Sequence, residues 1–94
     1  MNKVEINDLF DVYGSLLTKR QQEILQLYVQ EDFSYTEISE ELNISRAAVL
    51  DAVHKSIQAL QRYEASIEYI KRKEAVLNLV SKDESLFEKI QEIL

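Results

Sequence analysis

Residues 34–55 read SYTEISEELNISRAAVLDAVHK and contain two helical patterns separated by a very short turn. The first pattern begins at Ser34, which can cap a helix because Glu37 follows three residues later. It ends at Asn43, a residue that tolerates the left-handed conformation with which helices often stop. Ser45 can cap a second helix at once. A short helix, a tight turn and a longer helix in this order predict a helix-turn-helix.

The apolar residues of this stretch are spaced so that they meet between the two helices. We expect them to form a small core from Ile38, Leu42, Ile44, Val49 and Val53. Ser39 supplies the small side chain that is needed where the two helices cross closely. A simple antiparallel helix pair could use similar apolar residues, but the turn at residues 43–45 and the immediate new cap favour the helix-turn-helix.

Two further helices are predicted before this motif. Asn2 and Glu5 form a candidate capping box ahead of apolar residues at helical spacing, which predicts a first helix over about residues 3–16. Thr18 and Gln21 form a second candidate box and predict a helix over about residues 19–30.

A long helix is predicted after the turn, because nothing between Arg46 and Val80 breaks the helical pattern. Two apolar series with a spacing of seven residues predict a seam along this helix. The series are Val53, Leu60 and Ile67, and Tyr63, Ile70 and Leu77.

A last helix is predicted at the C-terminal end. Ser81 and Glu84 form a candidate capping box before its apolar residues, which are Leu86, Phe87, Ile90, Ile93 and Leu94. We expect this helix to fold back as a C-terminal helical hairpin, where it covers the long helix or forms a homodimer with a second copy.

The composition favours one all-α domain over residues 1–94, with the helix-turn-helix within about 34–62 and a C-terminal extension over about 63–94. The chain has no Pro and one Gly, whereas sheets need tight turns that draw on both residues. It has no Cys, and no stretch approaches the ~18 apolar residues of a membrane-spanning helix. We therefore expect a cytoplasmic protein without a membrane span.

The net charge restricts where a nucleic acid could bind. Eleven basic residues stand against seventeen acidic ones, giving −6, which opposes non-specific binding to polyanions. Residues 45–62 differ, because Arg46, Lys55 and Arg62 stand there against Asp51 alone. Any contact with nucleic acid must therefore be local.

The helix that begins at Ser45 offers the candidate contacts. Val49, Ala52 and Val53 should face inward, so the outward residues are Arg46, Ala47, Leu50, Asp51, His54 and Lys55. Arg46 suits guanine or phosphate, Ser45 and the helix N-terminus suit phosphate, and Lys55 can reach the backbone. Lys19 and Arg20 are the first residues of the helix predicted over about residues 19–30, and they are candidates for phosphate contacts of the same kind. The candidate nucleic-acid-binding residues are Lys19, Arg20, Ser45, Arg46, Ala47, Leu50 and Lys55.

Other interpretations of these residues stay open. Ser45 could serve only as a cap, with Arg46 and Lys55 solvated. Glu37, Glu40 and Glu41 form an acidic edge that would repel phosphate and could equally attract a basic protein. Tyr28, Tyr35, Tyr63 and Tyr69 could stack on unpaired bases, although a core role is favoured for Tyr28 and Tyr63.

Most of the chain resembles the bacterial YlxM family. The resemblance covers nearly all of residues 8–64 and is carried by DLFDVYGSLLTKRQQEILQLYVQEDFSYTEISEELNISRAAVLDAVHK and QALQRYE. The central part, LTKRQQEILQLY followed by SYTEISEELNISRAAV, is similar to region 4 of sigma factors. LFDVYGSLLT before it and QRYE after it narrow the choice to YlxM.

The YlxM resemblance implies a place in co-translational targeting. YlxM-like genes usually neighbour those for the signal recognition particle proteins Ffh and FtsY. The implied role is an accessory or regulatory protein of that pathway, in contact with the particle's RNA or with Ffh and FtsY, and this inference is associational. Ala47 and Leu50 depart from the polar or aromatic residues usual in relatives, and they cannot hydrogen-bond to base edges.

Catalysis finds no support in the sequence. The chain has no Gly-rich phosphate loop, no cluster of metal ligands, and no nucleophile near a base and an orienting group. His54, the single histidine, has no suitable neighbours and is expected to be a surface residue. We expect no enzyme, metal or cofactor. Three functions remain: a targeting accessory that binds nucleic acid, a sigma-like DNA-binding regulator, and a protein-interaction module with a helix-turn-helix scaffold.

Overall fold

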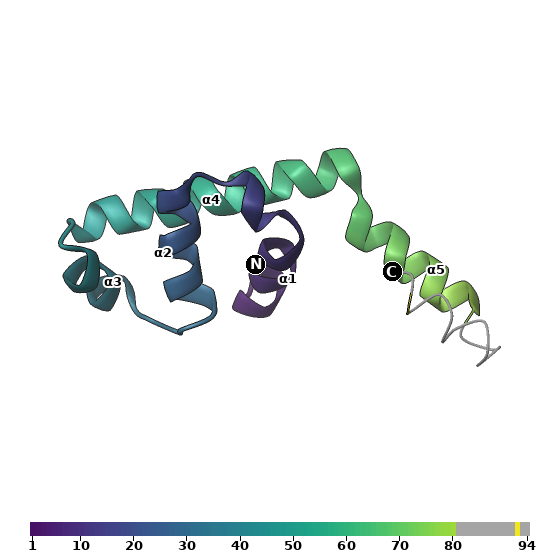
Figure 1. Ribbon diagram of the computed structural model, residues 1–94, viewed down its shortest axis with the longest axis horizontal. Coiled ribbons are helices and arrows are strands. Elements are labelled where there is room, and N and C mark those ends of the chain that lie inside the picture. Colours follow the sequence, from purple (N-terminus) through teal and green to yellow (C-terminus); the bar gives the residue numbers. More distant parts are fainter. Residues whose placement is uncertain (81–91, 93–94) are drawn as a thin grey trace. The chain divides into compact units, whose positions relative to one another are not determined.

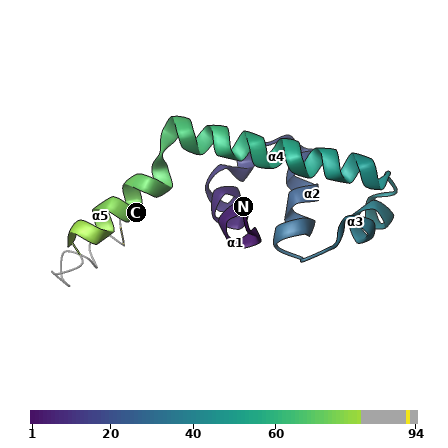
Figure 2. The ribbon, with the colours of Figure 1, turned by 180° about the vertical axis from the view of Figure 1, so that it is seen from behind.

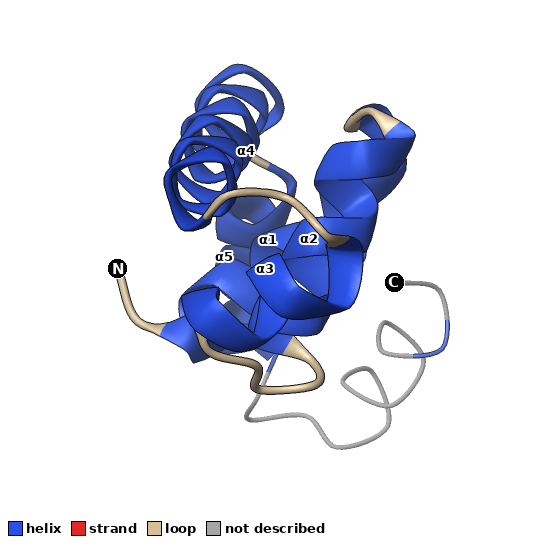
Figure 3. Ribbon diagram, turned by 90° about the vertical axis from the view of Figure 1, so that its left-hand side faces the viewer, coloured by secondary structure: helices blue, strands red, loops and turns tan. Residues whose placement is uncertain are grey.

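The computed structural model describes residues 1–80 and Glu92. This part of the chain contains helices and the turns that join them, and no strand (Figure 3). The elements are α1 (Lys3–Tyr13), the 3-10 turn η1 (Gly14–Leu16), α2 (Lys19–Val29), α3 (Tyr35–Leu42), α4 (Arg46–Ile67) and α5 (Tyr69–Val80). The predicted all-α fold is confirmed, and α3 and α4 are the two helices of the predicted helix-turn-helix. None of the described helices is both long enough and apolar enough to cross a bilayer.

Two helices begin with the predicted capping boxes. The Thr18 hydroxyl accepts a hydrogen bond from the Gln21 N–H at 3.2 Å, and the Gln21 side chain accepts one from the Thr18 N–H at 3.1 Å. Ser34 and Glu37 repeat this exchange at 3.1 and 3.0 Å. Each box satisfies two N–H groups that a helix start leaves free, so four residues suffice to define where α2 and α3 begin.

The first helix begins at the predicted residue but is not α-helical to residue 16. Asn2 accepts a hydrogen bond from the Glu5 N–H at 2.8 Å. The Glu5 carboxylate bonds the Asn2 side-chain amide at 3.2 Å and not its backbone, so only half of the predicted box forms. The α-helix ends at Tyr13, and the 3-10 turn follows with a Leu17 N–H to Gly14 C=O bond of 3.1 Å.

The turn of the helix-turn-helix forms as predicted. Asn43 is left-handed, with φ 53° and ψ 48°, and the Ile44 N–H donates to the Ser39 C=O at 3.1 Å. This bond satisfies a carbonyl group that the end of α3 would otherwise leave free. The Ser45 hydroxyl accepts from the Ala48 N–H at 3.0 Å and caps α4. The sharp reversal therefore needs only three residues.

The core of the helix-turn-helix lies where α1, α2 and α3 cover one side of α4 (Figures 1 and 2). Six large apolar side chains are at most 1% exposed: Ile24, Leu25, Ile38, Val49, Val53 and Leu60. Of the five residues predicted for the small core, Ile38, Val49 and Val53 are fully buried. Leu42 and Ile44 are only half-buried.

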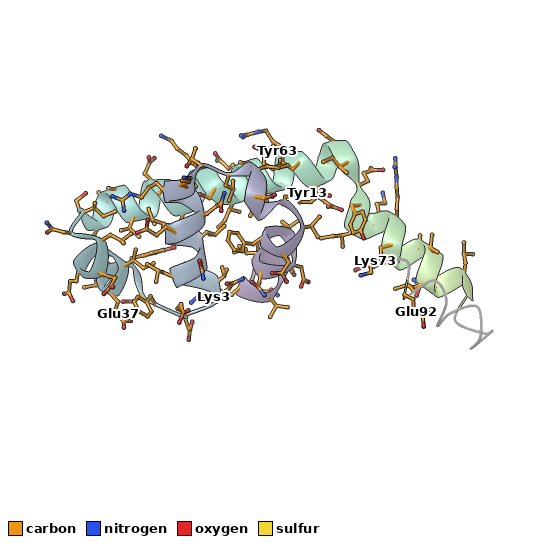
Figure 4. The ribbon with its side chains drawn as sticks, in the orientation of Figure 1. Lys3, Tyr13, Glu37, Tyr63, Lys73 and Glu92 are labelled. Carbon is orange, nitrogen blue, oxygen red and sulfur yellow. The ribbon has the colours of Figure 1, made fainter. Side chains whose placement is uncertain are left out.

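An aromatic contact joins the end of α1 to α4. The rings of Tyr13 and Tyr63 lie 6.3 Å apart and are tilted by 47° (Figure 4). The Tyr63 hydroxyl also lies 3.5 Å from the Leu16 carbonyl oxygen, to which it donates. Tyr63 is a half-buried residue of α4 that packs against the end of α1. This packing agrees with the core role that the sequence favoured over stacking on bases.

The prediction of an uninterrupted helix from Arg46 to Val80 is wrong at Glu68. This residue is left-handed, with φ 54°, and it separates α4 from α5. A left-handed non-glycine residue costs about 1–2 kcal/mol. The Glu64 carboxylate offsets part of that cost, because it accepts from the N–H groups of Ile70 and Lys71 at 3.1 and 3.3 Å and caps α5.

The predicted heptad seam ends at this break. Val53 and Leu60 are buried, but Ile67 is 45% exposed. Ile70 and Leu77 follow the left-handed Glu68 and belong to α5, so no single helix carries the whole of either series. The seam is therefore confirmed only in the part of α4 that belongs to the core.

The chain divides by its internal contacts into a compact unit, Met1–Tyr63, and a second unit that begins at Glu64. The turn, α3 and most of α4 lie in the first unit. The predicted last helix and the capping box at Ser81 and Glu84 lie outside the described residues, as does the homodimer contact expected there.

Candidate nucleic-acid interface

The outward face of α4 is exposed as predicted. Its members Arg46, Ala47, Leu50, Asp51, His54 and Lys55 are all exposed, whereas Val49 and Val53 are buried and Ala52 is half-buried. Leu50 is 39% exposed, a large fraction for an apolar side chain in the middle of a helix face. The face therefore combines two cationic residues with a small apolar surface.

The start of α4 presents its backbone donors beside a cationic side chain. The Ser45 hydroxyl already accepts from the Ala48 N–H, so its own O–H remains available to donate. The first N–H groups of an α-helix have no partner within the helix and carry partial positive charge. Within the described chain, Arg46 forms no ion pair. This arrangement can hold one phosphate group of a nucleic-acid backbone.

Lys55 is paired within its own helix. Its ammonium lies 3.0 Å from the Asp51 carboxylate, one helical turn earlier, and both side chains are about two-thirds exposed. Asp51 thus competes with phosphate for Lys55. The i, i+4 spacing of the two residues is the sequence signal from which this pair could have been predicted.

Lys19 and Arg20 lie exposed in the first turn of α2. Arg20 pairs with Glu23 at 3.5 Å, whereas Lys19 has no ion pair in the described part of the chain. No hydrogen bond or ion pair between described residues joins them to α4. The structure therefore places these two candidates on a separate element from the five on α4 and its cap.

His54 is an exposed residue of α4, as expected. Across residues 1–80 and Glu92, no group of three or more His, Cys, Asp or Glu side chains is arranged to hold a metal ion. His54 is one of the polar side chains on the exposed face of α4.

A cluster that the sequence did not predict holds α1 against the loop between α2 and α3. The Lys3 ammonium lies 2.6 Å from the Asp32 carboxylate and 4.4 Å from the centre of the Tyr28 ring. Tyr28 in turn stacks on Tyr35, with ring centres 5.3 Å apart and an interplanar angle of 11°. Tyr28 is thus engaged by two neighbours, which argues against its stacking on bases.

The contacts within this cluster shift the pKa of two of its side chains. The hydrogen bond from Lys3, together with its positive charge, lowers the pKa of Asp32 below its usual 3.8. The hydrogen bond between the Tyr28 and Tyr35 hydroxyl groups raises the pKa of Tyr35 above its usual 10, and burial adds to the rise. Lys3 and Asp32 are 29 residues apart, so no local pattern indicates that they meet.

The acidic edge of α3 adjoins an open hollow of about 400 Å³. The residues that line it are Phe33, Glu37, Glu40 and Glu41. The three carboxylates were predicted to share an edge, but Phe33 was missed. Phe33 stands directly before the cap of α3, where apolar residues commonly pack onto the helix that follows. This position is the sequence signal from which its packing on α3 could have been predicted.

A family model described as "Putative helix-turn-helix protein, YlxM / p13 like" matches residues 1–94. The chain belongs to this YlxM / p13-like family, UPF0122. The resemblance to YlxM inferred from the sequence is confirmed.

Individual YlxM / p13-like relatives are similar to the chain over different lengths. A UPF0122 protein of Desulforamulus reducens is 48% identical over 63 residues, which is 67% of this chain and 54% of that protein. UPF0122 protein YofM of Lactococcus lactis is 38% identical over 95 residues, 94% of this chain and 86% of that protein. A UPF0122 protein of Acetivibrio thermocellus is 50% identical over 68 residues, with 71% and 58% covered. The chain thus spans little more than half the length of most relatives it matches.

Membership of the YlxM / p13-like family supports a nucleic-acid-binding module, because a helix-turn-helix is the structure for which the family is described. In helix-turn-helix proteins the second helix of the motif contacts the major groove.

Proposed function

We propose that the chain is a non-enzymatic helix-turn-helix module that binds nucleic acid through the start of α4 and acts in the cytoplasm as an accessory of the signal recognition particle pathway. The observation that carries the proposal is the turn itself. Asn43 and Ser45 end one helix and start the next within three residues, which leaves Arg46 and the first N–H groups of α4 exposed.

The chemistry of the face favours recognition of the nucleic-acid backbone. Arg46, Ser45 and Lys55 can contact phosphate, whereas Ala47 and Leu50 cannot hydrogen-bond to bases. Binding of this kind reads the shape of a folded nucleic acid more than its sequence, and structured RNA is recognised largely in this way. The resemblance to YlxM, with its gene neighbourhood, makes the RNA of the signal recognition particle the first ligand to test.

DNA is the second candidate ligand, as for a sigma-like transcription regulator. The apolar side chains of Ala47 and Leu50 suit contact with the methyl group of thymine, which RNA lacks. Their exposure on the helix that should enter the major groove is the observation that favours DNA.

The proposal is tested by titrating the purified protein against fluorescent signal recognition particle RNA and random duplex DNA at two salt concentrations. The double variant Arg46→Ala, Lys55→Ala should weaken binding. It should also reduce the slope of log K against log salt concentration by about two, one for each lost phosphate contact. Lys71→Ala with Arg72→Ala removes the same charge from exposed residues of α5 and serves as the matched control.

The outcomes separate the functions. Preferential binding to the particle's RNA that depends on Arg46 and Lys55 supports the targeting accessory. Tighter binding to duplex DNA supports the regulator instead. Binding to neither ligand, or equal losses in the two double variants, would overturn the proposed interface.

A further inference from the structure

The hollow on α3 lies outside the candidate nucleic-acid interface. Its rim carries Glu37, Glu40 and Glu41, which share one helix face because they are three and four residues apart. Figure 4 shows the Glu37 side chain on the side of α3 that faces away from α4. Phe33 is the apolar residue of the lining, and it is half-buried.

The charges on this face weaken α3 as an isolated helix. Glu37 and Glu41 are like charges one turn apart, an arrangement that is unfavourable in a helix. Glu40 and Glu41 also lie in the last turn, where the helix dipole favours cations, and that turn contains no basic residue. Among the described residues, none of the three carboxylates forms an ion pair. A bound cation would remove both unfavourable interactions.

The combination of an aromatic ring with carboxylates selects among cations. A guanidinium group is planar, stacks on an aromatic face and donates two parallel hydrogen bonds to one carboxylate. An ammonium group is more strongly hydrated and lacks the planar fork. Phe33 offers the ring, and Glu40 and Glu41 are exposed. Glu37 has one oxygen engaged with the Ser34 N–H.

We propose that this hollow docks an arginine-bearing segment of a basic protein partner. Nucleic acid does not fit it, because three carboxylates repel phosphate. The proposal does not depend on the nucleic-acid interface of α4, since the two surfaces share no residue, and either one can fail alone. If both hold, one chain contacts a nucleic acid and a basic protein at the same time.

The probes are a short amidated Arg-Gly repeat peptide and the Lys-Gly peptide of equal length. Binding is measured by fluorescence anisotropy and located by the amide shifts of the isotope-labelled protein in NMR spectra. We expect the Arg peptide to bind about tenfold more tightly than the Lys peptide. Only a guanidinium group can stack on the ring of Phe33 and donate two parallel hydrogen bonds to one carboxylate. The amide shifts should centre on residues 33–41.

Two variants test the lining. Glu40→Gln with Glu41→Gln keeps the side-chain size and should weaken Arg peptide binding by about tenfold. Phe33→Leu keeps an apolar side chain and should reduce the preference for Arg over Lys, with a smaller loss of affinity. Far-ultraviolet circular dichroism checks that both variants stay folded, which is expected because the double variant relieves repulsion within α3.

The matched control is Asp8→Asn with Asp11→Asn, which removes two exposed carboxylates from α1 and changes the net charge equally. It should change peptide binding by less than about twofold. Equal losses in the two double variants, equal affinities of the two peptides, or amide shifts outside residues 33–41 would each overturn the proposal. Undiminished nucleic-acid binding by the Glu40 and Glu41 variant would confirm that the two surfaces are separate.

Discussion

Replacing Asp51 by Asn tests whether Lys55 faces phosphate groups. The two side chains form an ion pair of 3.0 Å within α4, and both are largely exposed, at 63% and 66%. Exposed pairs of this spacing contribute only about 0.3–0.5 kcal/mol to a helix. The substitution should therefore leave the fold intact while it frees Lys55 and removes a negative charge from the face.

The expected gain in affinity follows from two contributions. A carboxylate about 10 Å from a phosphate in water repels it by about 0.4 kcal/mol, and two such phosphates give about 0.8 kcal/mol. Freeing Lys55 from its partner adds about 0.3–0.5 kcal/mol. Together these amount to about 1.2 kcal/mol, or about an eightfold gain in affinity at low salt. Screening should reduce the gain substantially at physiological salt.

The assay is an anisotropy titration of labelled nucleic acid at low and physiological salt. Asp8→Asn is the control, because it removes one exposed carboxylate from α1 and should change affinity by less than about twofold. In a Lys55→Ala background, the effect of Asp51→Asn should fall to about fourfold, since only the direct repulsion remains. Equal effects of Asp51→Asn and Asp8→Asn would refute the reasoning, because the face of α4 would then not lie against phosphate.

Two further predictions concern stability. Val53→Ala should lower the free energy of unfolding by about 2–3 kcal/mol in urea denaturation, because two buried methyl groups are lost and a cavity remains, whereas Val4→Ala at a position 71% exposed should change it by less than about 0.5 kcal/mol. Similar losses at both positions would contradict the burial. Asp32→Asn should lower the melting temperature at pH 7, and by progressively less as the pH falls below about 3.8, because a lowered pKa stabilises the folded state above the usual value and that contribution is lost as pH falls through the folded pKa. A change in melting temperature that does not depend on pH would mean that the ion pair with Lys3 does not stabilise the fold.

The features that sequence reasoning predicted correctly are local. Thr18 and Ser34 each define a helix start within four residues, and Asn43 defines a helix end through its own backbone conformation. Such signals do not depend on how the helices pack. The same holds for the exposed face of α4, whose inward and outward residues follow from helical spacing alone.

The features that were missed depend on residues that meet through the fold or that break a local rule. Lys3 and Asp32 meet across 29 residues, so no local pattern indicates their contact. The break at Glu68 was missed because glutamate favours helices and neither Gly nor Pro marks the site. Its compensating interaction comes from the Glu64 side chain, which lies in the preceding helix.

The left-handed turn at Asn43 also limits how this surface can change by mutation. Among the residues that a single base change of an asparagine codon can produce, Asp tolerates this conformation best, whereas Gly requires two changes. Asp at this position would put a carboxylate two residues before Ser45, in the turn that leads into α4. The substitution that best preserves the turn is thus one that opposes anion binding at the helix it positions.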